Sequence, residues 1–499
     1  MNPLMLLEMA AAGFGERVAV QNGPDRLTYA ELFAAAGEAR RQIEASGAAH
    51  VGVLDVNSLA VPVGLFAAAW AGRPFVPLNY RLTADEVDAL VARIAPAFLV
   101  AEPERVERLA AVAGTRAVAR DRFLAALAGA GAAEPDWPAD PDAVAVLLFT
   151  SGTTGAPKAA VLRNRHLVSY ILGSVEFGAA GEDEAALVSV PPYHVAAMAA
   201  ILSCVYSGRR IVQLASFAPE SWVETARAER VTHAFVVPTM LGRIVDALEA
   251  TGERLPCLRA LSYGGGKMPL PVIERAMRLL PGVAFTNAYG LTETSSTISL
   301  LGPDDHRSAA ESGDPAVRRR LASVGRALPG VEIEVRDEDG KAVARGAPGE
   351  IHVRGEQVSG EYQGRGTALG QGGWFPTRDG GFLDEEGYLF VTGRIDDVIV
   401  RGGENLSPGE IEDALHEHPG VADCAVVGVP DEQWGEAVAA VIVPREGRQP
   451  APEELREWVR ARLRSSRVPE RIEFREALPY NETGKLLRRK VRAELAGAA

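Results

Sequence analysis

Short apolar runs alternate with longer, helix-length segments along most of the chain, from the N-terminal region to about residue 290. Runs of this kind are typical of strands buried on both faces, and they are expected at 51–56, 75–78, 143–149, 185–190, 210–214, 232–237, 258–264 and 284–290. Thr28 with Glu31, and Thr83 with Glu86, have the spacing of capping boxes and predict two helix starts. This alternation predicts parallel sheets covered by helices.

The pattern changes near Val331. The segments VEIEVRD, GEIHVRG and GYLFVTG alternate apolar and polar residues and are bounded by Gly, Pro and Asp. Such segments are typical of antiparallel strands, and we expect a small β-barrel subdomain over about 325–393.

A third pattern begins after Gly393 with a strand and a Gly-Gly turn. A helix opened by Ser407, Pro408 and Glu410 follows, then strands over 423–429 and 437–443 and an amphipathic helix near 452–463. We place the junction at 394–397. The fold prediction is therefore α/β, with a large N-terminal domain over 1–395 and a small mobile α+β domain over 396–499.

Composition narrows the classes of function. The 499 residues carry 52 Lys and Arg against 66 Asp and Glu, and the net charge of -14 argues against nucleic acid as a partner. The three cysteines lie far apart and predict neither a disulfide framework nor a zinc site. No basic segment precedes an apolar core near the N-terminus, and no apolar run is long enough for a membrane span. These features predict a soluble, cytoplasmic protein.

The apolar run at 143–149 ends in the sequence TSGTTGAPK, which predicts a loop that binds phosphate. Gly152 and Gly155 allow a tight turn whose N–H groups can point at an anion. Hydroxyl groups and Lys158 add further donors, although the Walker spacing is absent. A plain polar turn after a strand is the alternative interpretation.

Seven further motifs follow this loop, namely PPYH (191–194), YGGG (263–266), YGLTE (289–293), GWFPTRD (373–379), GRIDD (393–397), RGGEN (401–405) and NETGK (481–485). In this order they resemble the adenylate-forming superfamily of acyl-CoA synthetases, free-standing adenylation domains and luciferases. The resemblance extends from about Thr28 to Lys490. It implies that a carboxylate attacks ATP to give an acyl-adenylate and pyrophosphate, and that a thiol then displaces AMP. ATP, Mg²⁺ and CoA are the implied cofactors and co-substrates.

The resemblance also assigns catalytic residues. Lys485 matches the lysine that bridges the carboxylate and the α-phosphate, where positive charge offsets the repulsion of two anions. Glu293 matches the acid associated with magnesium, and Thr292 beside it would contact phosphate. His194 matches the aromatic gate of the acyl pocket.

For the nucleotide, Tyr289 resembles the residue that stacks on adenine, and Asp379 the acid that accepts the ribose hydroxyls, with a further contact from Arg394. Arg378 departs from the usual T-G-D pattern at a position where glycine can serve φ > 0 or space, and Ala159 stands where glycine usually follows the loop lysine. The expected nucleotide and CoA contacts are Thr150, Ser151, Gly152, Thr153, Thr154, Gly155, Lys158, Gly264, Gly265, Gly266, Asn287, Ala288, Tyr289, Gly290, Asp379, Arg394, Asp396, Gly402, Gly403 and Glu404.

The acyl site is predicted to be apolar. Amino-acid-activating relatives place an Asp near PPYHVAAM, and this segment has no carboxylate, so an aryl or aliphatic acid is expected. Candidate lining residues are Met198, Val236, Val237, Asn287 and Ala288.

The second step is predicted to depend on the junction. Asp396 matches the hinge residue about which the C-terminal domain rotates, and Gly402 and Gly403 resemble glycines that a pantetheine arm passes. An acyl-CoA synthetase is the main prediction. Alternatives are a ligase that loads a carrier protein, a biosynthetic ligase that uses an amine or nitrite, and a non-catalytic nucleotide-binding relative.

Overall fold

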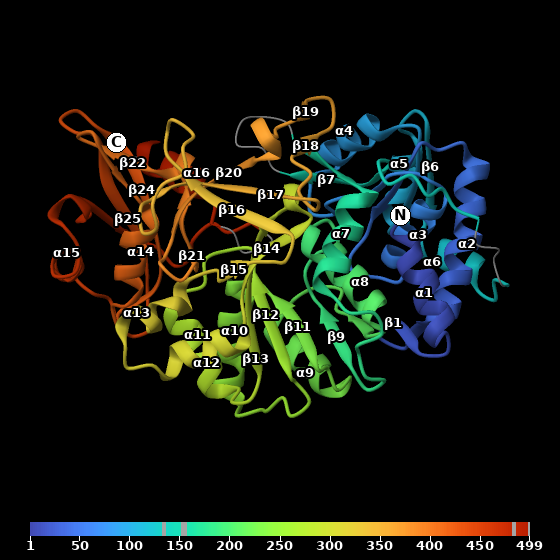
Figure 1. Ribbon diagram of the computed structural model, residues 1–499, viewed down its shortest axis with the longest axis horizontal. Helices are drawn as coiled ribbons and strands as arrows, with labels where there is room; N and C mark the ends of the chain where they lie inside the picture. The colour runs from blue at the N-terminus through green and yellow to red at the C-terminus, as the bar shows by residue number, and fades with distance from the viewer. Residues whose placement is uncertain (132–135, 151–156, 482–485, 498–499) are drawn as a thin grey trace.

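The computed structural model describes residues 1–131, 136–150, 157–481 and 486–497. Figure 1 shows a large N-terminal part with a smaller C-terminal part at one end of the long axis. The α/β class expected from the sequence is confirmed. Each of the eight strands predicted before residue 300 is present, with ends that differ by no more than two residues.

Two large sheets form the N-terminal part. The nine-stranded sheet has the order β15-β14-β13-β12-β11-β9-β10-β1-β2, and its strands from β1 to β13 along this order are parallel. Antiparallel strands close both edges. The strands are β1 (Val18–Asn22), β2 (Asp25–Thr28), β9 (Ala185–Val188), β10 (Arg210–Gln213), β11 (His233–Val236), β12 (Ala260–Gly264), β13 (Ala284–Leu291), β14 (Ser296–Leu301) and β15 (Arg326–Ala327).

The eight-stranded sheet has the order β19-β18-β8-β7-β4-β3-β5-β6. Strands β7, β4, β3, β5 and β6 are parallel, and β8 returns antiparallel to β7. The strands are β3 (His50–Leu54), β4 (Phe75–Pro77), β5 (Ala97–Ala101), β6 (Thr115–Ala119), β7 (Val144–Thr150), β8 (Lys158–Arg163), β18 (Glu361–Tyr362) and β19 (Gly366–Thr367).

Helices pack on both sheets. Every residue of α3 (Ala60–Trp70) is buried, as expected for a helix that is apolar on all sides, and α3 shares one core with α1, α2 and α8. Both predicted capping boxes are present, at the starts of α2 and α4. The other helices of this part are α1 (Leu4–Phe14), α2 (Tyr29–Ser46), α4 (Ala84–Ile94), α5 (Val106–Ala110), α6 (Arg120–Leu127), α7 (Asn164–Ser174), α8 (Val195–Ser207), α9 (Pro219–Ala228), α10 (Pro238–Thr251), α11 (Leu270–Leu279), α12 (Pro303–Glu311) and α13 (Pro315–Arg318).

The region predicted as a small barrel is a four-stranded antiparallel sheet. Its order is β16 (Val331–Arg336), β17 (Gly349–Gly355), β20 (Phe375–Leu383) and β21 (Leu389–Arg394). Among the described residues the outer strands β16 and β21 are not paired with each other, so this sheet is open. Four strands are too few to close around a core of their own. One apolar cluster instead joins Val331, Val353 and Phe375 to Ile298 of β14 in the nine-stranded sheet.

The C-terminal part is built on a five-stranded sheet. It contains β22 (Ile399–Arg401), β23 (Glu404–Leu406), β24 (Val421–Asp431), β25 (Gly435–Pro444) and β26 (Arg471–Phe474). Helices α14 (Pro408–His416), α15 (Pro452–Arg460) and α16 (Arg488–Gly497) pack against it. Ser407 precedes α14 as expected, but its hydroxyl makes no cap bond and donates instead to the carbonyl of Thr392, 2.8 Å away.

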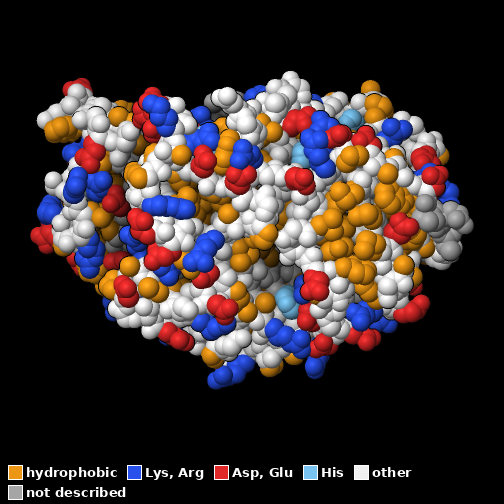
Figure 2. Space-filling model, in the orientation of Figure 1, with side chains coloured by type: hydrophobic (Ala, Val, Ile, Leu, Met, Phe, Trp, Pro, Cys, Tyr) orange, Lys and Arg blue, Asp and Glu red, His pale blue; other side chains and the backbone are white. Residues whose placement is uncertain are grey.

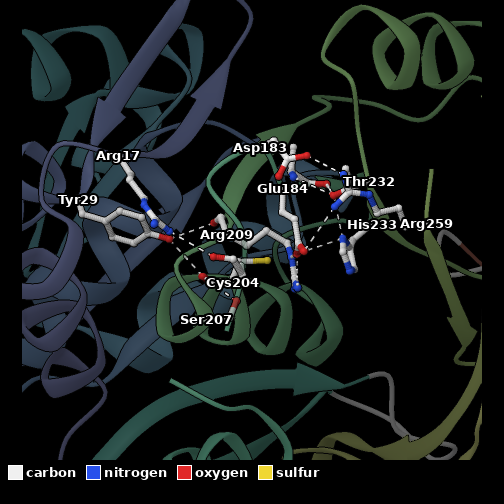
Figure 3. Close-up of polar contacts among 12 residues, drawn as sticks. Arg17, Tyr29, Asp183, Glu184, Cys204, Ser207, Arg209, Thr232, His233 and Arg259 are labelled. Atoms are coloured by element: carbon white, nitrogen blue, oxygen red, sulfur yellow. Dashed lines mark hydrogen bonds and ion pairs between the residues drawn. The ribbon is translucent and has the colours of Figure 1, made fainter. Parts of the chain in front are cut away.

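A polar cluster lies where β9, β10 and β11 begin, at the opposite end of the nine-stranded sheet from the motif loops (Figure 3). Arg209 forms an ion pair with Glu184 at 2.8 Å, and the Tyr29 hydroxyl donates to the carbonyl of Arg209 at 3.0 Å. Burial, reinforced by Arg209, lowers the pKa of His233 to about 4, so this ring is neutral at pH 7. This cluster ties the strands together. Within the described ranges no helix is long and apolar enough to cross a membrane.

Candidate functional site

The predicted motifs gather beyond the carboxyl ends of the parallel strands, where open α/β sheets bind ligands. The PPYH segment follows β9, the glycine triplet ends β12, and YGLTE ends β13. Figure 2 shows one face of the molecule, which is hollowed near its centre. The fold places these three motifs, which are distant in sequence, at one edge of the nine-stranded sheet.

Asp379 lies at the centre of a network between β13, β20 and β21. The side chain of Asp379 is 10% exposed, and its carboxylate accepts a hydrogen bond from the Tyr289 hydroxyl at 2.7 Å and pairs with Arg394 Nε at 3.0 Å. Burial, with the negative charge of Asp379 nearby, raises the pKa of Tyr289, so its hydroxyl stays protonated and donates. Arg394 also donates to the carbonyl of Thr377 at 3.0 Å. Three predicted nucleotide residues are thus held together.

A second cluster connects the phosphate loop to the predicted metal ligand. Strands β7 and β8 pair Thr150 with Lys158, which fixes both ends of the loop. The Lys158 ammonium lies 5.6 Å from the centre of the Tyr362 ring, and the Tyr362 hydroxyl donates to Glu293 Oε1 at 2.6 Å. The N–H groups of Ser359 and Gly360 bind the Glu293 carbonyl. Tyr362 therefore joins two predicted site residues.

Two glycines of the motifs allow close backbone approach. A Cβ at Gly264 would lie 2.2 Å from the carbonyl oxygen of Ala288, and one at Gly290 would lie 1.7 Å from that of Ser296. Ser295 and Ser296 themselves have positive φ values of 57° and 101°. Such backbone concentrates at functional sites, and here it shapes the turn that presents Glu293.

His194 precedes α8, and its ring packs against that of its neighbour Tyr193 in a tilted arrangement, with ring centres 4.5 Å apart and an interplanar angle of 55°. Its Nε2 atom is buried and has no hydrogen-bond partner among the described residues. Burial, reinforced by the charge of Arg81, lowers the pKa of His194 to about 4. The ring is therefore neutral at pH 7 and has one unsatisfied nitrogen.

The junction residues after Arg394 make contacts of their own. Asp396 pairs with Arg378 at 2.8 Å. Gly402 and Gly403 have φ values of 57° and 82° and form an exposed turn between β22 and β23. Glu404 pairs with Arg467 within the C-terminal part at 2.9 Å.

Other predicted residues fall in different surroundings. Met198 and Val236 are fully buried core residues, and the Asn287 amide donates to the carbonyl of Ser323 at 2.9 Å. Thr292 is half-buried beside Glu293, and Gly265 and Gly266 continue the turn after β12. Ser151, Gly152, Thr153, Thr154, Gly155 and Lys485 lie outside the described residues.

Sequence reasoning missed Tyr362 and Lys267. Tyr362 belongs to the two-residue strand β18, whose antiparallel pairing with β8 carries it to Glu293. Lys267 follows the glycine triplet, and its ammonium binds Asp413 of α14 at 2.6 Å. Neither has a local pattern that marks it, because both contacts are made across long sequence separations.

The residues around Glu293 fit a magnesium ion that is held mainly by phosphate. Within the described ranges no three His, Cys, Asp or Glu side chains are grouped as a complete metal site. Tyr362 occupies one oxygen of Glu293, which leaves the other for a ligand. Mg²⁺ commonly binds one or two carboxylates together with phosphate oxygens and water, and Glu293 suits that role.

Comparisons with known proteins agree with this arrangement. The model of the AMP-binding enzyme family matches residues 7–363, and that of the AMP-binding enzyme C-terminal domain matches residues 410–485. The chain is 35% identical over 482 residues to a feruloyl-CoA synthase of Amycolatopsis sp, with 95% of each chain covered. It is 33% identical over 486 residues to the fatty acid–[acyl-carrier-protein] ligase ScoC of Streptomyces coeruleorubidus, with 94% and 92% covered.

Among solved structures, the o-succinylbenzoate CoA synthetase of Bacillus subtilis in complex with the acyl-adenylate intermediate OSB-AMP matches with a TM-score of 0.84. The two chains are 28% identical, and the match covers 99% of this chain and 98% of the other. Fold, motif order and sequence identity agree. The chain belongs to the AMP-binding enzyme family, in the acyl-CoA synthetase branch of the adenylate-forming superfamily.

Proposed function

We propose that this enzyme activates an aryl carboxylic acid without an α-amino group and transfers the acyl group to free CoA. As an AMP-forming acid–thiol ligase, it first converts the acid and ATP to an acyl-adenylate and pyrophosphate, and a thiol then displaces AMP. Two features are proposed here, namely that the acid is aromatic and that the acceptor is free CoA. The environment of His194 is the observation that supports an aromatic acid.

A neutral imidazole with one unsatisfied nitrogen, packed beside the Tyr193 ring, suits an aromatic substrate with a polar substituent. A hydrogen bond from that substituent would satisfy the buried Nε2 atom, and an unpaired buried group is costly. An α-ammonium group, in contrast, would find no carboxylate in residues 191–198. The feruloyl-CoA synthase relative is named for an acid of this type.

The other roles follow from the clusters. Asp379, held by Tyr289 and Arg394, would accept the ribose hydroxyls. Glu293, oriented by Tyr362, would hold Mg²⁺, which neutralises phosphate charge when bound. Lys485 would bridge the carboxylate and the α-phosphate in the first step. The exposed Gly402–Gly403 turn would line the path of pantetheine after the C-terminal domain rotates.

A panel of acids tests the proposal, with pyrophosphate and CoA-thioester formation measured side by side. Hydroxycinnamic acids should be the best substrates, ahead of unsubstituted aryl acids and fatty acids. His194→Phe should reduce activity with hydroxylated aryl acids about three- to tenfold, the effect of one lost hydrogen bond, and spare unsubstituted ones. Equal rates with phenylalanine and with the best aryl acid would contradict the proposed acyl site.

Transfer to a carrier protein is the second candidate, because ScoC is named as an acyl-carrier-protein ligase. Free CoA and a phosphopantetheinylated carrier protein present the same thiol. Turnover with free CoA supports the first acceptor. Accumulation of acyl-adenylate in saturating CoA, with thioester formed only on a carrier protein, would support the second.

A further inference from the structure

Three polar contacts join the N-terminal part to the start of the C-terminal part. Lys267, just after the glycine triplet, donates to the carbonyl of Gly409 at 3.1 Å and to Asp413 at 2.6 Å. The Ser407 hydroxyl donates to the carbonyl of Thr392. We call these, together with the Arg378–Asp396 ion pair, the junction contacts. Each of these contacts joins a residue that precedes the predicted hinge in the sequence to Asp396 or to a residue after it.

Helix α14 packs closely against the N-terminal part in this orientation of the C-terminal part. A Cβ at Gly409 would lie 2.7 Å from the carbonyl oxygen of Thr392 and 3.3 Å from the Lys267 ammonium. The first turn of α14 therefore sits directly on the end of β21 and on Lys267. Rotation of the C-terminal domain about Asp396 would separate α14 from Lys267 and from the end of β21, and so break the contacts of Lys267 and Ser407.

The orientation differs from the one that thioester formation needs under the proposed function. The Gly402–Gly403 turn is exposed, and its hairpin pairs only with β25 among the described strands. We propose that Lys267 and Arg378 act as positioning residues that hold the C-terminal domain in the orientation used before thioester formation. Their ion pairs would then set how the enzyme partitions between its two half-reactions. The inference rests on the proposed domain rotation.

Both ion pairs are partly exposed. The side chains of Lys267 and Asp413 are 40% and 54% exposed, and those of Arg378 and Asp396 are 60% and 47% exposed. Pairs of this exposure contribute little each and are screened by salt. Weak ion pairs of this kind can favour one orientation of the C-terminal domain and still break in every turnover. Stronger contacts would slow the rotation of the domain.

The test measures each half-reaction separately in Lys267→Gln, Asp413→Asn, Arg378→Asn and the double variant Lys267→Gln/Arg378→Asn. Asn tolerates the positive φ of 62° at residue 378. Adenylate formation, measured as pyrophosphate release, should slow in each single variant, and thioester formation from pre-made acyl-adenylate and CoA should accelerate. The ratio of the first rate to the second should fall about two- to fivefold. Opposite changes are the signature of a shifted orientation, because a purely structural defect would slow both steps.

Glu417→Gln is the matched control. Glu417 ends α14, is 54% exposed like Asp413, and pairs with Arg462 inside the C-terminal part. It should leave both half-reactions unchanged, and exchanging the charges in Lys267→Asp/Asp413→Lys should restore the wild-type ratio. An unchanged ratio in the double variant, or equal loss in both steps, would overturn the inference. Failure of the wild-type enzyme to form any thioester would instead overturn the proposed function.

Discussion

At the scale of single residues, Arg378 is the clearest departure from the family pattern. It adopts φ of 62°, in the left-handed region where glycine is the usual residue, and its guanidinium reaches Asp396. The positive φ agrees with one of the two reasons for which glycine is usual at this position, and the ion pair is made with the predicted hinge residue. A left-handed non-glycine residue costs about 1–2 kcal/mol, which the exposed ion pair offsets only in part.

Arg378→Gly should therefore stabilise the folded state slightly, by up to about 1 kcal/mol, because relief of the backbone strain outweighs the lost ion pair. The ATP KM should stay unchanged, since Asp379 and Arg394 remain to hold the ribose. Urea unfolding and ATP titrations measure the two effects. A several-fold rise in the ATP KM would show that Arg378 binds phosphate.

Tyr362 is a second residue with a specific expected role. Tyr362→Phe removes the donor to Glu293 Oε1, so the half-saturating Mg²⁺ concentration of adenylate formation should rise about three- to tenfold. Tyr388→Phe is the matched control, because the Tyr388 hydroxyl donates to Asp305 at the same distance of 2.6 Å, away from the motif loops. The same Mg²⁺ dependence in both variants would contradict a positioning role for Tyr362.

At the scale of elements, local patterns predicted the parallel strands and the helix starts well. Buried strands can be recognised as apolar runs, and capping boxes such as Thr28 with Glu31 are local in sequence. The open four-stranded sheet was mistaken for a barrel, because alternation identifies strands but not whether the outer two meet. Its apolar face is covered by β14, a neighbour that the pattern does not reveal.

Site residues, too, could be predicted where the signal is local in sequence and not where it depends on distant contacts. Residues inside named motifs, such as Asp379 and Glu293, could be found from the sequence because the family fixes their spacing. Tyr362 could not, since it reaches Glu293 through the pairing of β18 with β8. The roles assigned to the motif residues, and the domain boundary at 395, stay predictions.

Three histidines in different elements, of which His166 is the most deeply buried, predict how stability depends on pH. The pKa values of His166, His194 and His233 are lowered to about 4, chiefly by burial and then by nearby arginines. Between their ordinary value of 6.5 and about 4 the unfolded chain binds more protons than the folded chain, so stability falls as pH is lowered through this window. The slope is at most about 1.4 kcal/mol per pH unit for each histidine.

Chemical unfolding at pH 7, 6 and 5 measures this slope. His166→Gln should make it shallower, because one proton-binding difference is removed. Burial raises the pKa of Asp55, and this group therefore stabilises the fold as pH is lowered, opposite to the histidines. The comparison is therefore between the pH slopes of unfolding free energy in the variant and in the wild type. An identical slope in the variant would contradict a neutral, buried His166.

At the scale of the whole molecule, the proposed function requires that two parts serve one reaction site and change their relative orientation. The nucleotide cluster around Asp379 and the cluster around Glu293 both belong to the N-terminal part. The Gly402–Gly403 turn and Lys485 belong to the C-terminal part, and the turn is exposed in this structure. The junction contacts hold the two parts in one orientation. The proposed function therefore depends on alternation of the C-terminal domain between the two half-reactions.

Lys485→Ala tests that claim most directly, with each half-reaction measured alone. Adenylate formation should fall on the order of a hundredfold or more, the effect of losing a key electrostatic contact to the joined anions. Thioester formation from pre-made acyl-adenylate and CoA should continue at the wild-type rate, because the rotated domain no longer presents Lys485. Equal loss in both half-reactions would contradict the account.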